Sequence, residues 1–264
     1  MNDQYSQQPQ PDASNSNVTR VPVPRGGSQP PKTPSTPLVT YTLLGLTVIV
    51  YLLQMGTDNM LGYDLPAALG LKVNELIVAG QLWRLITPVL LHGSLVHIGF
   101  NMYALYLFGP RLENNFGHWR FLSLYLISGF AGNVFSMMFT QAPSLGSSTA
   151  IFGLLGAHGI FVYQNRAFFG EPISRAALSR IVQVAAINLI IGLSPGIDNW
   201  GHVGGLIGGT LFTWFGGPLL GVSGIHPNQF IADQRDNSDT LQAIAISGGY
   251  FIFLAAGALY LMTR

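Results

Sequence analysis

Residues 201–209 have the sequence Gly-His-Val-Gly-Gly-Leu-Ile-Gly-Gly, and they open an apolar run that extends to about residue 220. Gly205 and Gly209 are four residues apart, so they lie on one face of a helix and let a second helix approach closely. About 20 apolar residues can cross a bilayer as a helix that satisfies its own backbone. The stretch therefore predicts a closely packed transmembrane helix that carries one ionisable side chain, His202.

Apolar runs of similar length recur along the chain. Hydrophobic residues make up 48% of the sequence, charged residues make up only 9%, and the mean hydropathy is +0.38. Such a chain has too little polar surface to cover a water-soluble globule of this length. We therefore expect an all-α polytopic membrane protein with seven spans. The six other runs cover residues 38–56, 95–116, 121–139, 148–163, 176–192 and 241–262.

The remaining segments suggest how the chain is divided. Residues 1–37 are rich in Gln, Pro, Ser, Asn and Thr and poor in large apolar side chains, so we expect a disordered cytoplasmic N-terminal tail. Residues 38–220 would form a six-helix core, residues 221–240 a polar linker, and residues 241–264 a seventh transmembrane helix. We expect no cleavable signal peptide, because the first apolar run is long enough to span a bilayer.

Composition also excludes several functions. The chain has no cysteine, which rules out disulfides, thiolate metal sites and cysteine nucleophiles. The net charge is +1 and the cations are scattered, so the basic patch that binds phosphates is missing and we expect no nucleic-acid partner. We expect neither a metal site nor a cofactor.

The cationic residues predict the orientation, because Lys and Arg are retained in the cytoplasm during insertion. Nine of them fall on one side of the predicted spans and three on the other, so the N-terminus is expected in the cytoplasm. The spans that begin at residues 95, 148 and 201 would then start at the outer face. The two groups are Arg20, Arg25, Lys32, Arg111, Arg120, Arg166, Arg175, Arg180 and Arg235, against Lys72, Arg84 and Arg264.

Polar side chains collect at that outer level, where they would face the interior of the bundle or a wet cavity. His97, Asn101, Ser148 and His202 all lie in the first turns of these three spans. Ser148 begins a helix, where unpaired amides and the helix dipole can hold an oxyanion. Taken alone, a serine in this position, or its neighbour Ser147, is more typical of a simple helix N-cap.

The glycine pattern supports a reacting pair. Gly153 and Gly156 give span four a small-residue face that matches Gly205 and Gly209. Packing through these faces would bring Ser148 and His202 within hydrogen-bond reach, where a neutral imidazole can activate a hydroxyl nucleophile. Small-residue faces alone usually indicate packing only. The inference therefore depends on the polar groups at their outer end.

Other polar residues could assist this pair. His97 and Asn101 are four residues apart on one helix face, and both can donate hydrogen bonds to an oxyanion; an interfacial histidine and a bundle hydrogen bond are the alternatives. Asp198 could orient His202 as a triad carboxylate, but its loop position favours helix capping. We therefore expect a Ser and His dyad, with Phe152 one turn below Ser148 stacking on the imidazole.

These residues resemble the rhomboid family of intramembrane serine proteases. Residues 146–153, Gly-Ser-Ser-Thr-Ala-Ile-Phe-Gly, are similar to its Gly-x-Ser-Gly nucleophile motif, and residues 201–209 to its Ala-His-x-x-Gly-x-x-x-Gly helix. The resemblance covers residues 38–220. Its other matching positions are the pair His97 and Asn101, the pair Trp83 and Arg84 in the first loop, and Gly109, Glu113 and Gly117 at the end of span two.

The resemblance implies a six-helix core plus one C-terminal helix, with an outward-opening active site that cleaves single-span membrane proteins near the outer membrane face. Ser148 and His202 would be catalytic, and His97 and Asn101 would stabilise the oxyanion. Structural or gating roles would fall to six residues, namely Trp83, Arg84, Gly146, Phe152, Gly205 and Gly209. The expected partners are transmembrane protein substrates and the lipid bilayer, in a bacterial plasma membrane.

Two residues depart from the family pattern, and two alternative functions remain open. Thr149 replaces the usual Gly after the nucleophile, and Gly201 replaces Ala before the histidine. Glu113 lies far from the nucleophile, so we assign it to helix packing or to pairing with a nearby Arg.

The alternative functions are a non-catalytic rhomboid-like binder or chaperone for membrane proteins, and a transporter. The concentration of polar groups at one face argues against a transporter.

Overall fold

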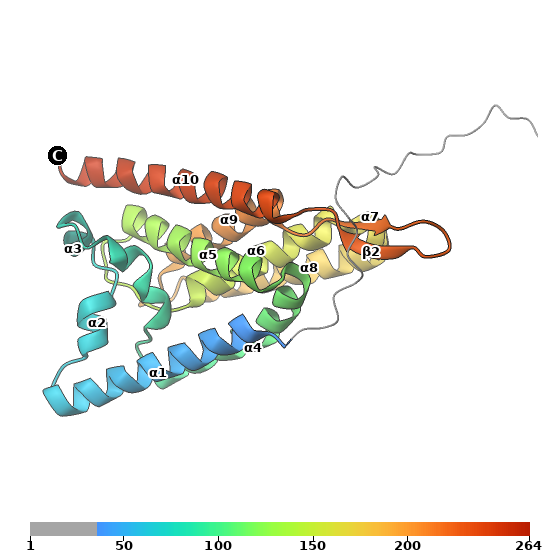
Figure 1. The fold of residues 1–264 in the computed structure, drawn as a ribbon. Helices are drawn as coiled ribbons and strands as arrows, with labels where there is room; N and C mark the ends of the chain where they lie inside the picture. The colour runs from blue at the N-terminus through green and yellow to red at the C-terminus, as the bar shows by residue number, and fades with distance from the viewer. Residues whose placement is uncertain (1–35) are drawn as a thin grey trace, which may run out of the picture.

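A computed structural model describes residues 36–264, so nearly all of the segment expected to be a disordered tail, residues 1–37, lies outside the described residues. The described chain is mostly helical (Figure 1). Its long helices are α1 (Leu38–Leu61), α4 (Leu95–Phe116), α5 (His118–Phe139), α6 (Ser148–Gln164), α8 (Glu171–Ile191), α9 (Asn199–Gly216) and α10 (Asn237–Met262). The all-α polytopic fold class is confirmed.

Short elements fill the connections. The loop between α1 and α4 contains α2 (Leu65–Gly70), α3 (Asn74–Val78) and the 3-10 turns η1 (Leu82–Leu85) and η2 (Thr87–Leu90). One further turn of helix, α7 (Arg166–Phe169), precedes α8. The segment expected to be a polar linker contains an antiparallel hairpin of β1 (Leu220–Ser223) and β2 (Phe230–Asp233), in which Leu220 pairs with Asp233.

Helices α1, α5, α8 and α10 are long and apolar enough to cross a membrane, by length and composition. The three long helices outside this set, α4, α6 and α9, are those that carry the polar candidate residues. Their histidines, glycines and asparagines lower the mean hydropathy, and α6 is only 17 residues long. The expected seven crossings therefore remain a prediction, although each expected span coincides with a long helix.

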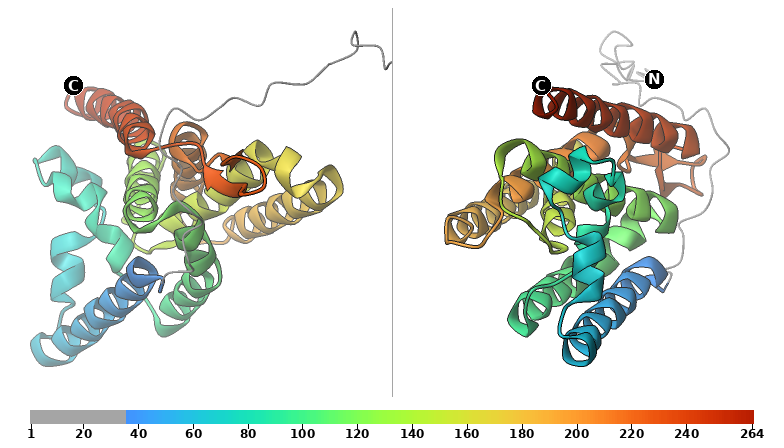
Figure 2. Two further views of the ribbon diagram at one scale, coloured as in Figure 1. Left: turned by 45° about the vertical axis from the view of Figure 1, so that its right-hand side comes forward. Right: turned by 90° about the vertical axis from the view of Figure 1, so that its left-hand side faces the viewer.

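The helices differ in how much of their surface the protein covers. In α5, 72% of the most apolar window is buried, whereas the corresponding windows of α1 and α10 are 22% buried and that of α8 is 6% buried. Helix α5 therefore lies inside the bundle, against α6 and α9. The views in Figure 2 agree, with α1, α8 and α10 on the outside, where their apolar side chains suit contact with lipid.

Helices α6 and α9 pack with their backbones in contact. A Cβ atom built on Gly205 would lie 1.9 Å from the carbonyl oxygen of Thr149, and one on Gly209 would lie 2.0 Å from the carbonyl oxygen of Gly153. No side chain larger than hydrogen fits at these two positions of α9. The glycine spacing in the sequence thus corresponds to the closest helix approach at the site.

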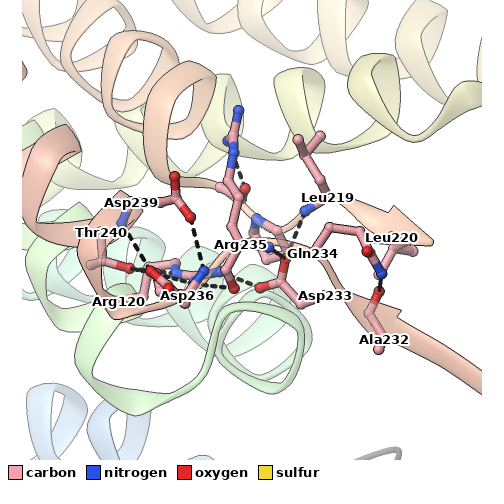
Figure 3. A network of polar contacts seen from close by, with 12 residues as sticks. Arg120, Leu219, Leu220, Ala232, Asp233, Gln234, Arg235, Asp236, Asp239 and Thr240 are labelled. Atoms are coloured by element: carbon pink, nitrogen blue, oxygen red, sulfur yellow. Dashed lines mark hydrogen bonds and ion pairs between the residues drawn. The ribbon is translucent and has the colours of Figure 1, made fainter. Parts of the chain in front are cut away.

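One end of the bundle is tied together by two arginines (Figure 3). Arg120 at the start of α5 forms an ion pair with Asp233 (2.6 Å) and donates to the Thr240 hydroxyl (2.9 Å). Arg235 donates to the carbonyl oxygens of Gly217 (2.7 Å) and Trp214 (2.8 Å) at the end of α9. The hairpin therefore links α5, α9 and α10.

Glu113 caps α1 from the end of α4. Its carboxylate accepts from the amides of Val39 (2.8 Å) and Thr40 (2.7 Å) and from the Thr40 hydroxyl (2.6 Å). These amides are among the first N–H groups of a helix, which have no partner within it. The expected role in helix packing is thus confirmed, and the side chain that pairs with Glu113 is His118 (2.5 Å) rather than an arginine.

Candidate functional site

Ser148 and His202 meet where α6 and α9 begin. The Ser148 Oγ lies 2.9 Å from Nε2 of His202, which is in the first turn of α9. His202 is buried, whereas Ser148 is partly exposed. With the imidazole proton on Nδ1, the hydroxyl donates to Nε2, the arrangement in which a histidine can accept the serine proton.

Packing holds the imidazole in orientation. The ring of Phe152, one turn further along α6, is stacked on the His202 ring with centroids 4.3 Å apart and planes 10° apart. The backbone contact of Thr149 with Gly205 sets the separation of the two helices at the same level. Helix packing thus holds both residues of the pair in place.

The described residues supply no carboxylate to His202. Its Nδ1 is buried without a hydrogen-bond partner there. Asp198 instead caps α9, since its side chain accepts from the Gly201 amide (3.0 Å). The same carboxylate accepts from the Thr140 hydroxyl (3.3 Å). Among the described residues no carboxylate hydrogen-bonds to the imidazole, and Asp198 has the capping contact that its loop position favours.

His97 also lies at this level, across Gly146. A Cβ atom built on Gly146 would lie 2.7 Å from Nε2 of His97 and 3.6 Å from Oγ of Ser148, so glycine separates the two groups. Gly146 has a φ of +127°, a backbone conformation that favours glycine. Asn101 is buried, and its amide donates to the His97 carbonyl oxygen (3.0 Å) within α4. The structure brings His97 beside Gly146, in the loop that precedes Ser148, but gives Asn101 a partner in its own helix.

The buried His92, which lies beside His97, was not among the predicted site residues. The His92 ring packs edge-on to His97, with centroids 5.0 Å apart, and its Nε2 lies 3.3 Å from the Ser147 hydroxyl. Gln54 of α1 accepts from the His92 amide (3.0 Å). Burial, and then the nearby His97, lower the pKa of His92 to about 4. Gln54, a polar residue within an apolar run, was the signal available in the sequence.

Trp83 and Arg84 organise the first loop and lie apart from the Ser148 and His202 pair. The buried Arg84 guanidinium donates to the carbonyl oxygens of Leu71 and Ala68, both at 2.6 Å. The half-exposed Trp83 donates from Nε1 to the Leu69 carbonyl oxygen (3.0 Å) and lines a cavity of about 260 Å³ with it. Their contacts are therefore structural ones within the loop.

Comparison with known proteins identifies the family. Residues 79–219, more than half of the chain, match the model of the rhomboid domain. The chain belongs to the rhomboid family. The matched range includes His97, Ser148 and His202, so the geometry above lies within the rhomboid domain. With its apolar helices, this membership makes the chain an integral multi-pass membrane protein.

Similar rhomboids occur in bacteria and plants. The chain is 38% identical over 174 residues to rhomboid protease GluP of Bacillus subtilis (strain 168), covering 66% of this chain and 34% of the relative. It is 32% identical over 163 residues to RHOMBOID-like protein 9, chloroplastic, and 40% identical over 136 residues to RHOMBOID-like protein 6, mitochondrial, both of Arabidopsis thaliana. These matches cover 62% and 51% of this chain, and 38% and 44% of the two relatives. The chain thus spans less than half the length of each of these relatives.

The rhomboid site departs from the family pattern at Thr149, and α5 accommodates the change. A Cβ atom built on Gly132 of α5 would lie 2.5 Å from Cβ of Thr149 and 2.6 Å from the carbonyl oxygen of Gly201. The Thr149 side chain therefore fills the space that glycine leaves between α5, α6 and α9. It lies in the helix interface, beside the second departure, Gly201.

Proposed function

We propose that this rhomboid is an intramembrane serine endopeptidase in which Ser148 is the nucleophile and His202 the general base. The observation that carries the proposal is the 2.9 Å contact between Ser148 Oγ and His202 Nε2 at the ends of two helices locked by glycines. A weak hydroxyl nucleophile needs such a base within hydrogen-bond distance. The relative named rhomboid protease GluP supports the same activity.

The mechanism follows from the two side chains. His202 Nε2 takes the proton of Ser148 while Oγ attacks the scissile carbonyl carbon and forms a tetrahedral oxyanion. The imidazolium then gives that proton to the leaving amine, the C–N bond breaks, and an acyl-enzyme forms. A water molecule, deprotonated by His202, hydrolyses the ester and restores Ser148. Orientation of the imidazole comes from Phe152 rather than from a carboxylate.

The oxyanion would be held by groups around Gly146. The Ser148 amide is at the first position of α6, where helix N–H groups lack partners within the helix and the dipole favours negative charge. His97 lies next to Gly146 and could donate from Nε2. Asn101 would contribute its second amide hydrogen, since the first is bonded to the His97 carbonyl oxygen.

The substrates we propose are single-span membrane proteins, cut near the outer face. The described cations support this orientation: five belong to the elements at the end of the bundle with α7 and the hairpin, three belong to the opposite end with α2, α3 and the C-terminus, and Arg180 is in the middle of α8 (Figure 1). Since Lys and Arg are retained inside, Ser148 would open to the outer side. A bacterial plasma membrane fits this proposal, although the relatives include chloroplast and mitochondrial proteins.

The test is cleavage of a single-span reporter by purified protein in liposomes, together with labelling by a fluorophosphonate probe. Wild type is expected to cleave and to be labelled, and Ser148→Ala to do neither while keeping the same thermal unfolding temperature. Gly248→Ala on α10 is the matched control, because a Cβ there meets nothing within 4 Å. Undiminished cleavage by Ser148→Ala contradicts the nucleophile assignment. A folded wild type that binds the reporter but is neither active nor labelled indicates a non-catalytic binder.

A further inference from the structure

Lys72 is a fully buried lysine in the first loop, between α2 and α3. A buried ammonium group requires partners that compensate for lost hydration. Its Nζ donates to the carbonyl oxygens of Thr140 (2.7 Å) and Ala142 (3.1 Å), which lie 68 and 70 residues further along the chain. Both carbonyls belong to the segment that connects α5 to α6. We call this segment, residues 140–147, the nucleophile loop, because it ends just before Ser148.

The backbone of Lys72 binds the same loop. Its amide donates to the Ser144 carbonyl oxygen and the Ser144 amide donates to the Lys72 carbonyl oxygen, both at 3.1 Å. The nucleophile loop is attached to the first loop at a second point, where the Gly146 amide donates to the Pro88 carbonyl oxygen (2.9 Å). The first loop therefore holds the nucleophile loop along most of its length, up to two residues before Ser148.

Thr140 connects Lys72 by hydrogen bonds to α9, the helix that contains His202. While its carbonyl oxygen accepts from Lys72, its hydroxyl donates to the Asp198 carboxylate (3.3 Å). That carboxylate caps α9, and the Asp198 carbonyl oxygen accepts from the His202 amide (3.2 Å). Lys72 thus lies at the start of two short chains of hydrogen bonds, one toward Ser148 and one toward His202.

We propose that Lys72 is a positioning residue for the reacting pair: it fixes the nucleophile loop and, through Thr140, the first turn of α9, without touching the substrate. The inference rests on the proposed function. It differs from a purely structural role because small displacements of a nucleophile from its base lower kcat while substrate binding is preserved.

The environment of Lys72 adds a pH signature. Burial lowers the pKa of Lys72 to about 8, while the negative charges of Asp198 and Glu75 act in the opposite direction. Asp198 belongs to the start of α9, and Glu75 to α3 on the other side. Above pH 8 the amine loses its charge, and its hydrogen bonds to the two carbonyl oxygens weaken because charge-assisted bonds are the stronger ones.

Three variants and a control test the proposal on the protein in liposomes, with kcat and KM for a single-span reporter and the rate of fluorophosphonate labelling as readouts. Lys72→Met is expected to lower kcat by about 10- to 100-fold and to change KM by less than about twofold. In wild type the labelling rate is expected to fall above pH 8, where Lys72 loses its charge. Lys72→Arg keeps a charged donor, so this variant should retain activity and should not show that fall. Glu75→Gln removes a charge that raises the pKa, so the fall should move to lower pH. Asp58→Asn, an exposed change at the end of α1, is the control and should match wild type.

The outcomes are distinguishable. Wild-type kcat in folded Lys72→Met, or an alkaline fall in labelling that persists unchanged in Lys72→Arg, overturns the positioning role and leaves the proposed function standing. If Lys72→Met does not fold, the pH profiles of the labelling rate of Lys72→Arg and Glu75→Gln decide whether Lys72 is a positioning residue. A wild-type protein that neither cleaves nor is labelled overturns both the proposed function and this inference.

Discussion

Gly205 of α9 lies against the Thr149 carbonyl oxygen of α6, so closely that a Cβ atom at residue 205 would be 1.9 Å from it. This contact lies one residue beyond Ser148 and one turn beyond His202. The separation of the two helices beside Ser148 and His202 is therefore limited by a contact with the backbone, which cannot give way as a side chain can. Overpacked cores commonly lose about 1–3 kcal/mol, and a clash with backbone belongs at the upper end of that range.

Gly205→Ala is accordingly expected to lower the thermal unfolding temperature and to abolish cleavage, because α9 must move away from α6. Unfolding in detergent and reporter cleavage measure the two effects. Gly257→Ala on α10, where a Cβ meets nothing within 4 Å, is the matched control and should match wild type. An active, stable Gly205→Ala protein would show that the two helices do not pack as described.

Asp198→Asn tests whether the pair works without a carboxylate. Asp198 caps α9 and does not hydrogen-bond to the imidazole, and the amide oxygen of Asn caps a helix as well as the carboxylate does, so the variant should lose only the charge–dipole contribution of about 0.3–1 kcal/mol. Its kcat should fall less than tenfold. Loss of the carboxylate in a Ser, His and Asp triad costs about 10⁴-fold. A loss of that size at residue 198 would mean that Asp198 orients His202.

Thr149→Val should leave stability unchanged or raise it. The Thr149 hydroxyl is buried and has no hydrogen-bond partner among the described residues, while its methyl group packs on Gly132 and Gly201. Valine keeps this shape and removes a polar atom whose burial without a partner costs about 1–3 kcal/mol. Thermal unfolding measures the change. A clear decrease in unfolding temperature would indicate that the hydroxyl has a partner in solution, such as water.

Arg120→Ala should destabilise the protein by about 2 kcal/mol, because it leaves the partly buried Asp233 without its ion pair and removes the donor to Thr240. The exposed pair of Arg175 and Glu171, 4.0 Å apart, provides the comparison. Arg175→Ala should change stability by less than about 0.5 kcal/mol. Equal effects of the two substitutions would contradict the role of the Arg120 contacts in joining α5 to α10.

His92 predicts an acid-dependent loss of stability. Burial, followed by the nearby His97, lowers its pKa to about 4, so between pH 6.5 and 4 the unfolded chain binds more protons than the folded one. Stability is therefore full above about pH 6.5 and is lost as the pH falls toward 4. Unfolding of wild type and His92→Gln across this range measures the contribution, and parallel curves for the two proteins would exclude it.

The sequence was sufficient for features that depend on helix periodicity. The long helices, the glycine faces of α6 and α9, and the stacking partner Phe152 all follow from helix periodicity, in which residues three or four apart lie on one face and geometry is nearly fixed. The meeting of Ser148 and His202 followed from two such faces. Their catalytic roles, by contrast, stay predictions until cleavage is measured.

Contacts between distant, irregular segments were not predictable. Lys72 reaches carbonyls 68 residues away, and nothing in its local sequence separates it from a surface lysine. For Glu113 the sequence predicted helix packing but not the groups it contacts, because the amides at the start of α1 carry no sequence signal of their own. Backbone groups in loops are specified by the final packing, which a single sequence does not reveal.

The capping of α1 by Glu113 has a consequence for the order of assembly. The amides of Val39 and Thr40 find their acceptor 73 or 74 residues later in the chain, at the end of α4. At about 5–20 residues per second, synthesis needs several seconds to deliver that carboxylate. Helix α1 is thus incomplete until the next long helix has been made, and the pairing of α1 with α4 becomes a checkpoint in biogenesis.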